Sequence, residues 1–100
     1  LHLVLSTSAN KDLDGIVEPL AVLADAVFVT KNNSVRSADP VALAARFDAR
    51  GVPVQSLPSV ADAIGAARAA AAPGDLILVT GSLYTVADAY RALGLSLGDN

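Results

Sequence analysis

The chain has 100 residues, of which 53% are apolar and 17% charged, so it is long and apolar enough to bury the core of one domain. It contains no cysteine, which excludes disulfides, thiolate metal sites and thiol nucleophiles and fits a reducing compartment. A net charge of −3 without a lysine and arginine cluster argues against nucleic acid as a partner. No apolar run approaches the roughly 20 residues of a membrane span, so we expect a cytoplasmic protein without a membrane partner.

Short apolar runs alternate with helical patterns along the whole chain, which predicts the order βαβαβαβα. The runs are continuous rather than alternating, as is typical of parallel strands covered on both faces. Right-handed crossovers between such strands place helices on the faces of the sheet. We therefore expect an α/β fold, a three-layer sandwich with an open, mainly parallel, Rossmann-like sheet, in one domain over residues 1–100. The predicted strands are residues 1–6, 26–30, 52–56 and 76–80.

Residues that favour helix starts stand before the first three helical patterns. Asn10 is the predicted N-cap of the first helix, whose apolar side chains form one stripe. Asp39 followed by Pro40 predicts the start of the second, because proline presets the backbone where no amide donor is needed. Ser59 and Asp62 have the spacing of a capping box at the third. The stripe of the first helix is Leu13, Ile16, Val17, Leu20 and Ala24.

Ligands of open parallel sheets bind beyond the carboxyl ends of the strands, where the turns and the positive helix ends converge. The longest of these turns, "KNNSVRSAD", contains Arg36, whose guanidinium group can hold a carboxylate with two hydrogen bonds. The alternative is a solvated loop arginine. Lys11 and Asp12 start the first helix, where a lysine opposes the helix dipole unless a bound phosphate compensates it. The alternative there is a surface pair in which Asp12 supports the helix start.

The last predicted strand runs into Gly81 and Ser82, before a fourth helical pattern over residues 83–94. Glycine permits a tight turn, and Ser82 either caps the helix or offers its hydroxyl group and nearby amides to an anion. His2, the only histidine, lies at the opposite edge of the sheet, which disfavours a catalytic triad. No P-loop, GxGxxG motif or metal-ligand spacing occurs, so we expect no catalytic residue, no metal site and no nucleotide site in this segment alone.

Taken in order, the segments "NKDLDGIVEPLAVLADAVFVT", "NSVRSADPVALA" and "DLILVTGSLYTVADA" resemble the C-terminal domain of the folylpolyglutamate synthase/dihydrofolate synthase family, a branch of the Mur ligase superfamily. The resemblance covers nearly the whole chain, and "TGSLY" with its strand is the most specific part. It implies an enzyme that uses ATP and Mg to phosphorylate a folate carboxylate, which the amino group of L-glutamate then attacks. It also implies an N-terminal P-loop ATPase domain and a "DGAHNP"-like turn, neither of which this segment contains, so we expect a fragment that is inactive alone.

The resemblance also implies roles for four residues. Ser82 matches the serine of "TGSLY", and Arg36 matches the arginine of an "NPR" loop, although Ser-Val stands here in place of Asn-Pro; both would bind glutamate. Lys11 and Asp12 match the end of a "DKD"-like turn, with asparagine in place of the first acid, and would contact the nucleotide or the acyl phosphate. The rival hypothesis is a non-catalytic flavodoxin-like or Rossmann-like binding domain in which these loops are merely structural. A phospho-receiver domain is disfavoured because the acids that it needs after the first and third strands are absent.

Overall fold

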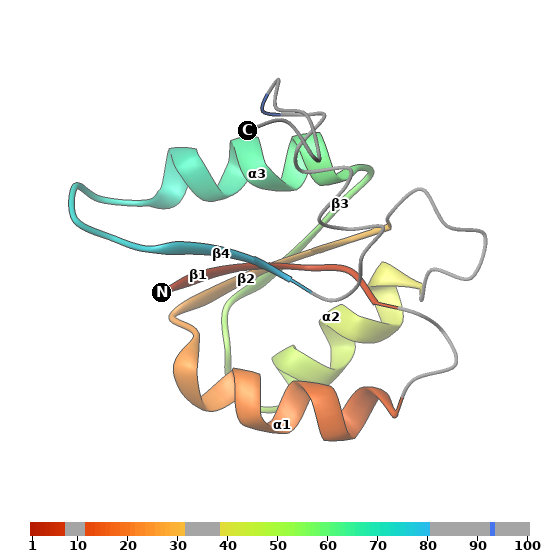
Figure 1. Ribbon diagram of the computed structural model, residues 1–100. Helices are drawn as coiled ribbons and strands as arrows, with labels where there is room; N and C mark the ends of the chain where they lie inside the picture. Colours follow the sequence, from red (N-terminus) through yellow and green to blue (C-terminus); the bar gives the residue numbers. More distant parts are fainter. Residues whose placement is uncertain (8–11, 32–38, 81–92, 94–100) are drawn as a thin grey trace, which may run out of the picture.

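The structure, a computed structural model, describes residues 1–7, 12–31, 39–80 and 93. Helices and strands alternate through these residues as the sequence predicts (Figure 1). The predicted fourth helix lies outside the described residues. The described elements are β1 (His2–Leu5), α1 (Leu13–Leu23), β2 (Ala26–Thr30), α2 (Pro40–Asp48), β3 (Val54–Leu57), α3 (Val60–Ala70) and β4 (Ile77–Thr80).

The described strands form one sheet in the order β3-β2-β1-β4, and every pairing is parallel. Helices α1 and α2 cover one face and α3 covers the other (Figure 1). The predicted three-layer sandwich is therefore confirmed. Because the chain moves from β1 outward to β3 and then returns to the far side of β1, the order reverses between β1 and β4, which is where such sheets bind ligands.

The continuous apolar run of β1 is explained by burial on both of its faces. Leu3 and Leu5 pack into the core under α1 and α2, whereas Val4 packs under α3, and all three are fully buried. Each such side chain contributes about 1.5–3 kcal/mol relative to an exposed one. On α3 the fully buried residues are Ala63 and Ala67, whose small size lets the helix lie close to the sheet.

The cap of α1 differs from the prediction. The N-cap is Asp12, whose carboxylate accepts a hydrogen bond from the Gly15 amide at 3.2 Å, and not Asn10. Two residues with N-cap preference precede the apolar stripe, and the one adjacent to Leu13 makes the cap, because the capping oxygen must reach an amide of the first turn.

The predicted starts of α2 and α3 are confirmed. The Asp39 carboxylate accepts a hydrogen bond from the Val41 amide at 3.0 Å, with Pro40 at the first helical position. The Ser59 hydroxyl accepts one from the Asp62 amide at 3.1 Å and donates one to the Asp62 carboxylate at 2.9 Å. None of the described helices is long and apolar enough to cross a membrane.

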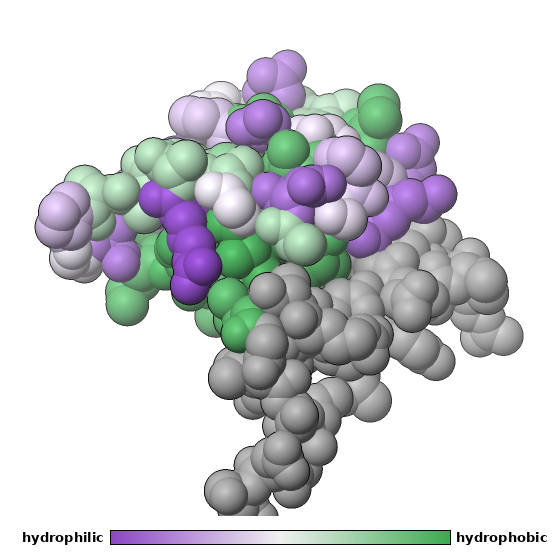
Figure 2. Space-filling view, turned by 90° about the horizontal axis from the view of Figure 1, so that it is seen from above, coloured by the Kyte–Doolittle hydropathy of each residue, from purple (hydrophilic) through white to green (hydrophobic). Residues whose placement is uncertain are grey.

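The strands β3 and β4 are shorter than predicted at their starts. The Pro53 carbonyl accepts a hydrogen bond from the Val27 amide at 2.9 Å, but proline has no amide of its own, so the regular ladder begins at Val54. On β4, Leu78 points to the same face as its neighbour Leu3 yet is 44% exposed, because α1 and α2 do not extend over this face of β4. Ile77 and Val79 pack against the α3 core on the other face. Figure 2 shows hydrophobic and hydrophilic residues side by side on the face seen from above, the side of the molecule on which α3 lies in Figure 1.

Candidate functional site

The carboxyl edge of the sheet brings together the ends of the strands and the starts of α1, α2 and α3, on the right of Figure 1. Each of these helix starts presents backbone amides and the positive end of a helix dipole. The registers place Val29, Leu5 and Thr80 in one row across β2, β1 and β4. The chain therefore leaves β2 and β4 on either side of β1, about 10 Å apart at two strand spacings.

Of the four predicted site residues, the structure places one. Asp12 lies at the carboxyl edge, exposed, at the start of α1. Lys11, Arg36 and Ser82 lie outside the described residues, so whether they share one ligand stays a prediction. The structure does show where the segments that carry Arg36 and Ser82 begin, which is directly after Lys31 and directly after Thr80.

Acidic groups predominate at the described part of this edge. Its helix starts carry the carboxylates of Asp12, Asp39 and Asp62, all exposed. Among the described residues that directly follow a strand, Lys31 is the basic one. An anionic ligand at this edge therefore needs further positive charge, which Lys11 and Arg36 would supply.

Buried hydroxyl groups follow the strands, and they were not predicted from the sequence as part of the site. Ser6 and Thr7 are fully buried after β1, and the Ser6 amide donates to the Thr80 carbonyl at 3.3 Å. The Thr30 hydroxyl donates to the Leu57 carbonyl at 2.8 Å. By contrast, the buried Thr7 Oγ1 has no hydrogen-bond partner in the described part of the chain. The signal in the sequence is the run "STS" directly after the strand next to the reversal of strand order.

His2 has a structural position at the opposite, amino edge of the sheet. Its Nε2 lies 3.0 Å from Asp75 Oδ2, and its ring centre lies 6.3 Å from that of Phe28. Asp75 Oδ2 also accepts a hydrogen bond from the Ala72 amide at 2.8 Å. The hydrogen bond from the Ala72 amide lowers the pKa of the Asp75 carboxyl group below its usual value, and the contact with the His2 ring is the second cause. These contacts tie the start of β1 to the turn before β4, so His2 does not serve a triad at the carboxyl edge.

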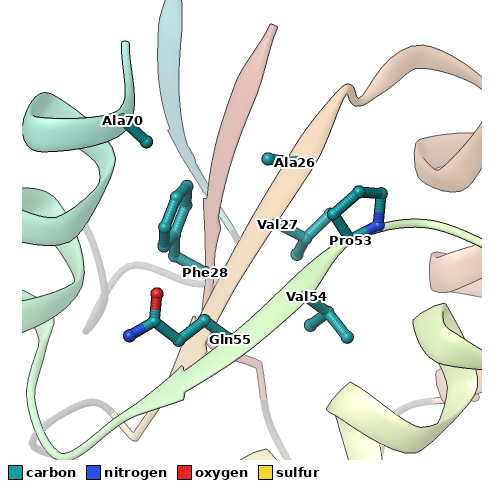
Figure 3. A pocket seen from close by; sticks show the side chains of 7 residues that line it. All are labelled: Ala26, Val27, Phe28, Pro53, Val54, Gln55 and Ala70. Atoms are coloured by element: carbon teal, nitrogen blue, oxygen red, sulfur yellow. The ribbon is translucent and has the colours of Figure 1, made fainter.

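The cavity in Figure 3 also lies away from the predicted site. It has a volume of about 220 Å³ and opens near the amino edge, between β2, β3 and the end of α3. Within residues 1–7, 12–31, 39–80 and 93, no group of three or more potential metal ligands occurs. The lining of the cavity is mostly apolar and consists of Ala26, Val27, Phe28, Pro53, Val54, Gln55 and Ala70.

Comparison with known families and proteins agrees with the resemblance inferred from the sequence. The model of the family described as "Mur ligase, glutamate ligase domain" matches residues 1–83. A curated relative, the probable bifunctional folylpolyglutamate synthase/dihydropteroate synthase of Haloferax volcanii, is 40% identical over 90 residues. That match covers 89% of this chain and 11% of the relative.

Solved structures match over nearly the whole chain. Folylpolyglutamate synthase of Mycobacterium tuberculosis, complexed with ADP and AMPPCP, is 36% identical with a TM-score of 0.82, over 95% of this chain and 24% of that one. E. coli FolC, in complex with DHPP and ADP, is 26% identical with a TM-score of 0.81, over 94% of this chain and 22% of that one. The chain thus spans about a quarter or less of the relatives that it matches.

Proposed function

Because the chain belongs to the glutamate ligase domain family of the Mur ligases, we propose that it is the glutamate-binding domain of an ATP-dependent ligase that adds glutamate to a folate. The observation that carries this proposal is the similarity to folylpolyglutamate synthases, at 40% identity to the Haloferax volcanii relative and 36% to the Mycobacterium tuberculosis enzyme. We assign residues 1–100 to this domain and expect the ligase to act in the cytoplasm.

The proposed reaction forms an amide in two steps. Phosphoryl transfer from ATP to a folate carboxylate gives an acyl phosphate; the glutamate amino group then attacks its carbonyl carbon, loses a proton and expels phosphate. The described residues hold neither a phosphate-binding loop nor a group of metal ligands, so they do not fit ATP and Mg²⁺ by themselves. We assign both to the N-terminal P-loop domain that the resemblance implies.

In this proposal the chain's own residues hold and orient glutamate. The Arg36 guanidinium group pairs with a glutamate carboxylate, and the Ser82 hydroxyl group donates a hydrogen bond to the same ligand. Lys11 and Asp12 lie beside the nucleotide or acyl phosphate, where the Lys11 ammonium offsets negative charge. One observation supports this arrangement: the chain leaves β2 and β4 on either side of β1, at the carboxyl edge where the starts of the described helices also lie.

The test uses the full-length protein with a folate, ATP and labelled glutamate. We expect Arg36→Ala to raise the Michaelis constant for glutamate about 10- to 100-fold, the effect of losing about 1.5–3 kcal/mol of charged hydrogen bonding, with little change in that for ATP. Ser82→Ala should act in the same direction but less strongly. The matched control is Arg68→Ala, since Arg68 is an exposed arginine in the last turn of α3, away from the carboxyl edge.

The rival hypothesis of a non-catalytic binding domain predicts a different result. Absence of glutamate incorporation by the full-length protein would favour that rival. If the full-length protein incorporates glutamate and neither Arg36→Ala nor Arg68→Ala changes this activity, the ligase proposal stands but Arg36 is not part of the glutamate site.

A further inference from the structure

The carboxylate of Asp12 lies directly over the first turn of α1, against a glycine. Its Oδ1 accepts the hydrogen bond from the Gly15 amide at 3.2 Å. A Cβ atom at position 15 would lie 2.7 Å from Asp12 Oδ2 and 3.2 Å from Asp12 Cγ. Real Cβ atoms do not approach other atoms as closely as 2.7 Å, so a residue with a side chain at position 15 would force the carboxylate to move.

A second helical glycine provides the contrast within the same chain. Gly65 lies in the middle of α3, and a Cβ atom there would meet nothing within 4 Å. Both glycines weaken their helices relative to alanine, because glycine loses more backbone freedom on folding. Gly15 thus differs from Gly65 in lying in the first turn of its helix and in its contact with the Asp12 carboxylate.

We propose that Gly15 is a positioning residue, which holds the Asp12 carboxylate at the carboxyl edge by leaving it room against the first turn of α1. The inference rests on the proposed function, which places Asp12 beside the nucleotide or acyl phosphate. With alanine at position 15 the exposed Asp12 side chain, rather than the helix backbone, gives way. The carboxylate then no longer caps α1 and no longer lies at its place on the carboxyl edge.

The test is a double-mutant cycle in the full-length protein, with Gly15→Ala, Asp12→Ala, the double variant and the control Gly65→Ala. We expect Gly15→Ala and Asp12→Ala each to lower kcat/KM for glutamate ligation about tenfold, the size of one charged contact. Because both changes remove the same carboxylate from its place, the double variant should be within about twofold of Asp12→Ala. Gly65→Ala should leave kcat/KM unchanged and raise the melting temperature.

Thermal unfolding of the same variants gives a readout that does not depend on ligation. Gly15→Ala alone should fail to raise the melting temperature, because loss of the cap offsets the gain in helix propensity. In the Asp12→Ala background, where no carboxylate is displaced, Gly15→Ala should raise it as Gly65→Ala does.

Two results would overturn the inference. The first is wild-type kcat/KM in Gly15→Ala while Asp12→Ala is impaired, and the second is a rise in melting temperature from Gly15→Ala that is the same in both backgrounds. A full-length protein that incorporates no glutamate would instead count against the proposed function, and the melting temperatures would still decide whether Gly15 positions Asp12.

Discussion

The helix caps at the carboxyl edge of the sheet and the His2–Asp75 pair at its amino edge are different kinds of contact. At the carboxyl edge each described helix start is capped by a side chain within three residues of the amide that it binds, as with Asp12 and Gly15. At the amino edge the side chain of His2 meets Asp75, which lies at the far end of the described chain. These caps do not join distant segments, and at this edge the Thr30 hydroxyl group joins β2 to β3 instead, whereas the His2–Asp75 contact joins β1 to the turn before β4. We therefore expect substitutions at the amino edge to affect mainly stability and substitutions at the carboxyl edge to affect binding as well.

The largest effect on stability should come from Thr7, where the carboxyl edge buries a hydroxyl group without a described partner. Thr7→Val keeps the shape and removes the polar atom, so we expect the free energy of unfolding to rise by about 1–3 kcal/mol, the usual cost of an unsatisfied buried group. Chemical denaturation of both proteins measures this difference in the free energy of unfolding. A loss of stability instead would mean that the hydroxyl group is bonded in the folded protein, and the contrast between the edges would weaken.

Thr30→Val should have a smaller effect of the opposite sign. The Thr30 hydroxyl is equally buried but donates to the Leu57 carbonyl of the neighbouring strand. Its removal should lower the free energy of unfolding by about 1 kcal/mol, the net value of one hydrogen bond. Measuring Thr30→Val and Thr7→Val under the same conditions distinguishes a hydrogen-bonded hydroxyl group from one without a described partner at the same edge. Equal changes in the free energy of unfolding in both variants would contradict this assignment.

The smallest effect should come from Asp75→Asn at the amino edge, because this carboxylate is partly exposed to solvent. The pKa of Asp75 is lower in the folded state than its ordinary value of 3.8, mainly through the Ala72 amide and then through His2. The stability that this carboxylate contributes is thus fully present above about pH 4 and is lost as the pH falls through the lower folded pKa. We expect wild type to be more stable than Asp75→Asn at pH 6 and the difference to shrink at pH 3. Unfolding curves at the two pH values check it, and a difference independent of pH would rule out the ionised carboxylate as its source.

Local signals explain which parts of the fold were predictable. Asp39 and Ser59 were identified as caps because a capping residue and its amide lie within three positions in sequence. The parallel pairing follows from the alternation of strands and helices and from general rules for such sheets, whereas the strand order was not predicted. The prediction of Asn10 as the N-cap of α1 was wrong because two residues that favour this position, Asn10 and Asp12, lie within one short turn. The His2–Asp75 contact could not be predicted, because it depends on the register of β1 against β4.

The candidate site was less predictable than the fold. The burial of Thr7 is set by packing between segments, which no local pattern encodes. Asp12 was identified by its place at a predicted helix start and by the resemblance, but its contact with Gly15 depends on the three-dimensional structure. Lys11, Arg36 and Ser82 rest on their places in the predicted turns and on the resemblance, and they stay predictions.

The position of β1 between β2 and β4 has a consequence for synthesis on the ribosome. The strands β1, β2 and β3 are neighbours in sequence and can pair as soon as they emerge, but β4 must return across all of them to reach the free side of β1. Such distant pairing is slow because a long loop has to close first. Until it does, the side of β1 that β4 occupies in the described sheet is unpaired with β4, and the proposed glutamate site, which uses the turn after β4, cannot be complete before that pairing.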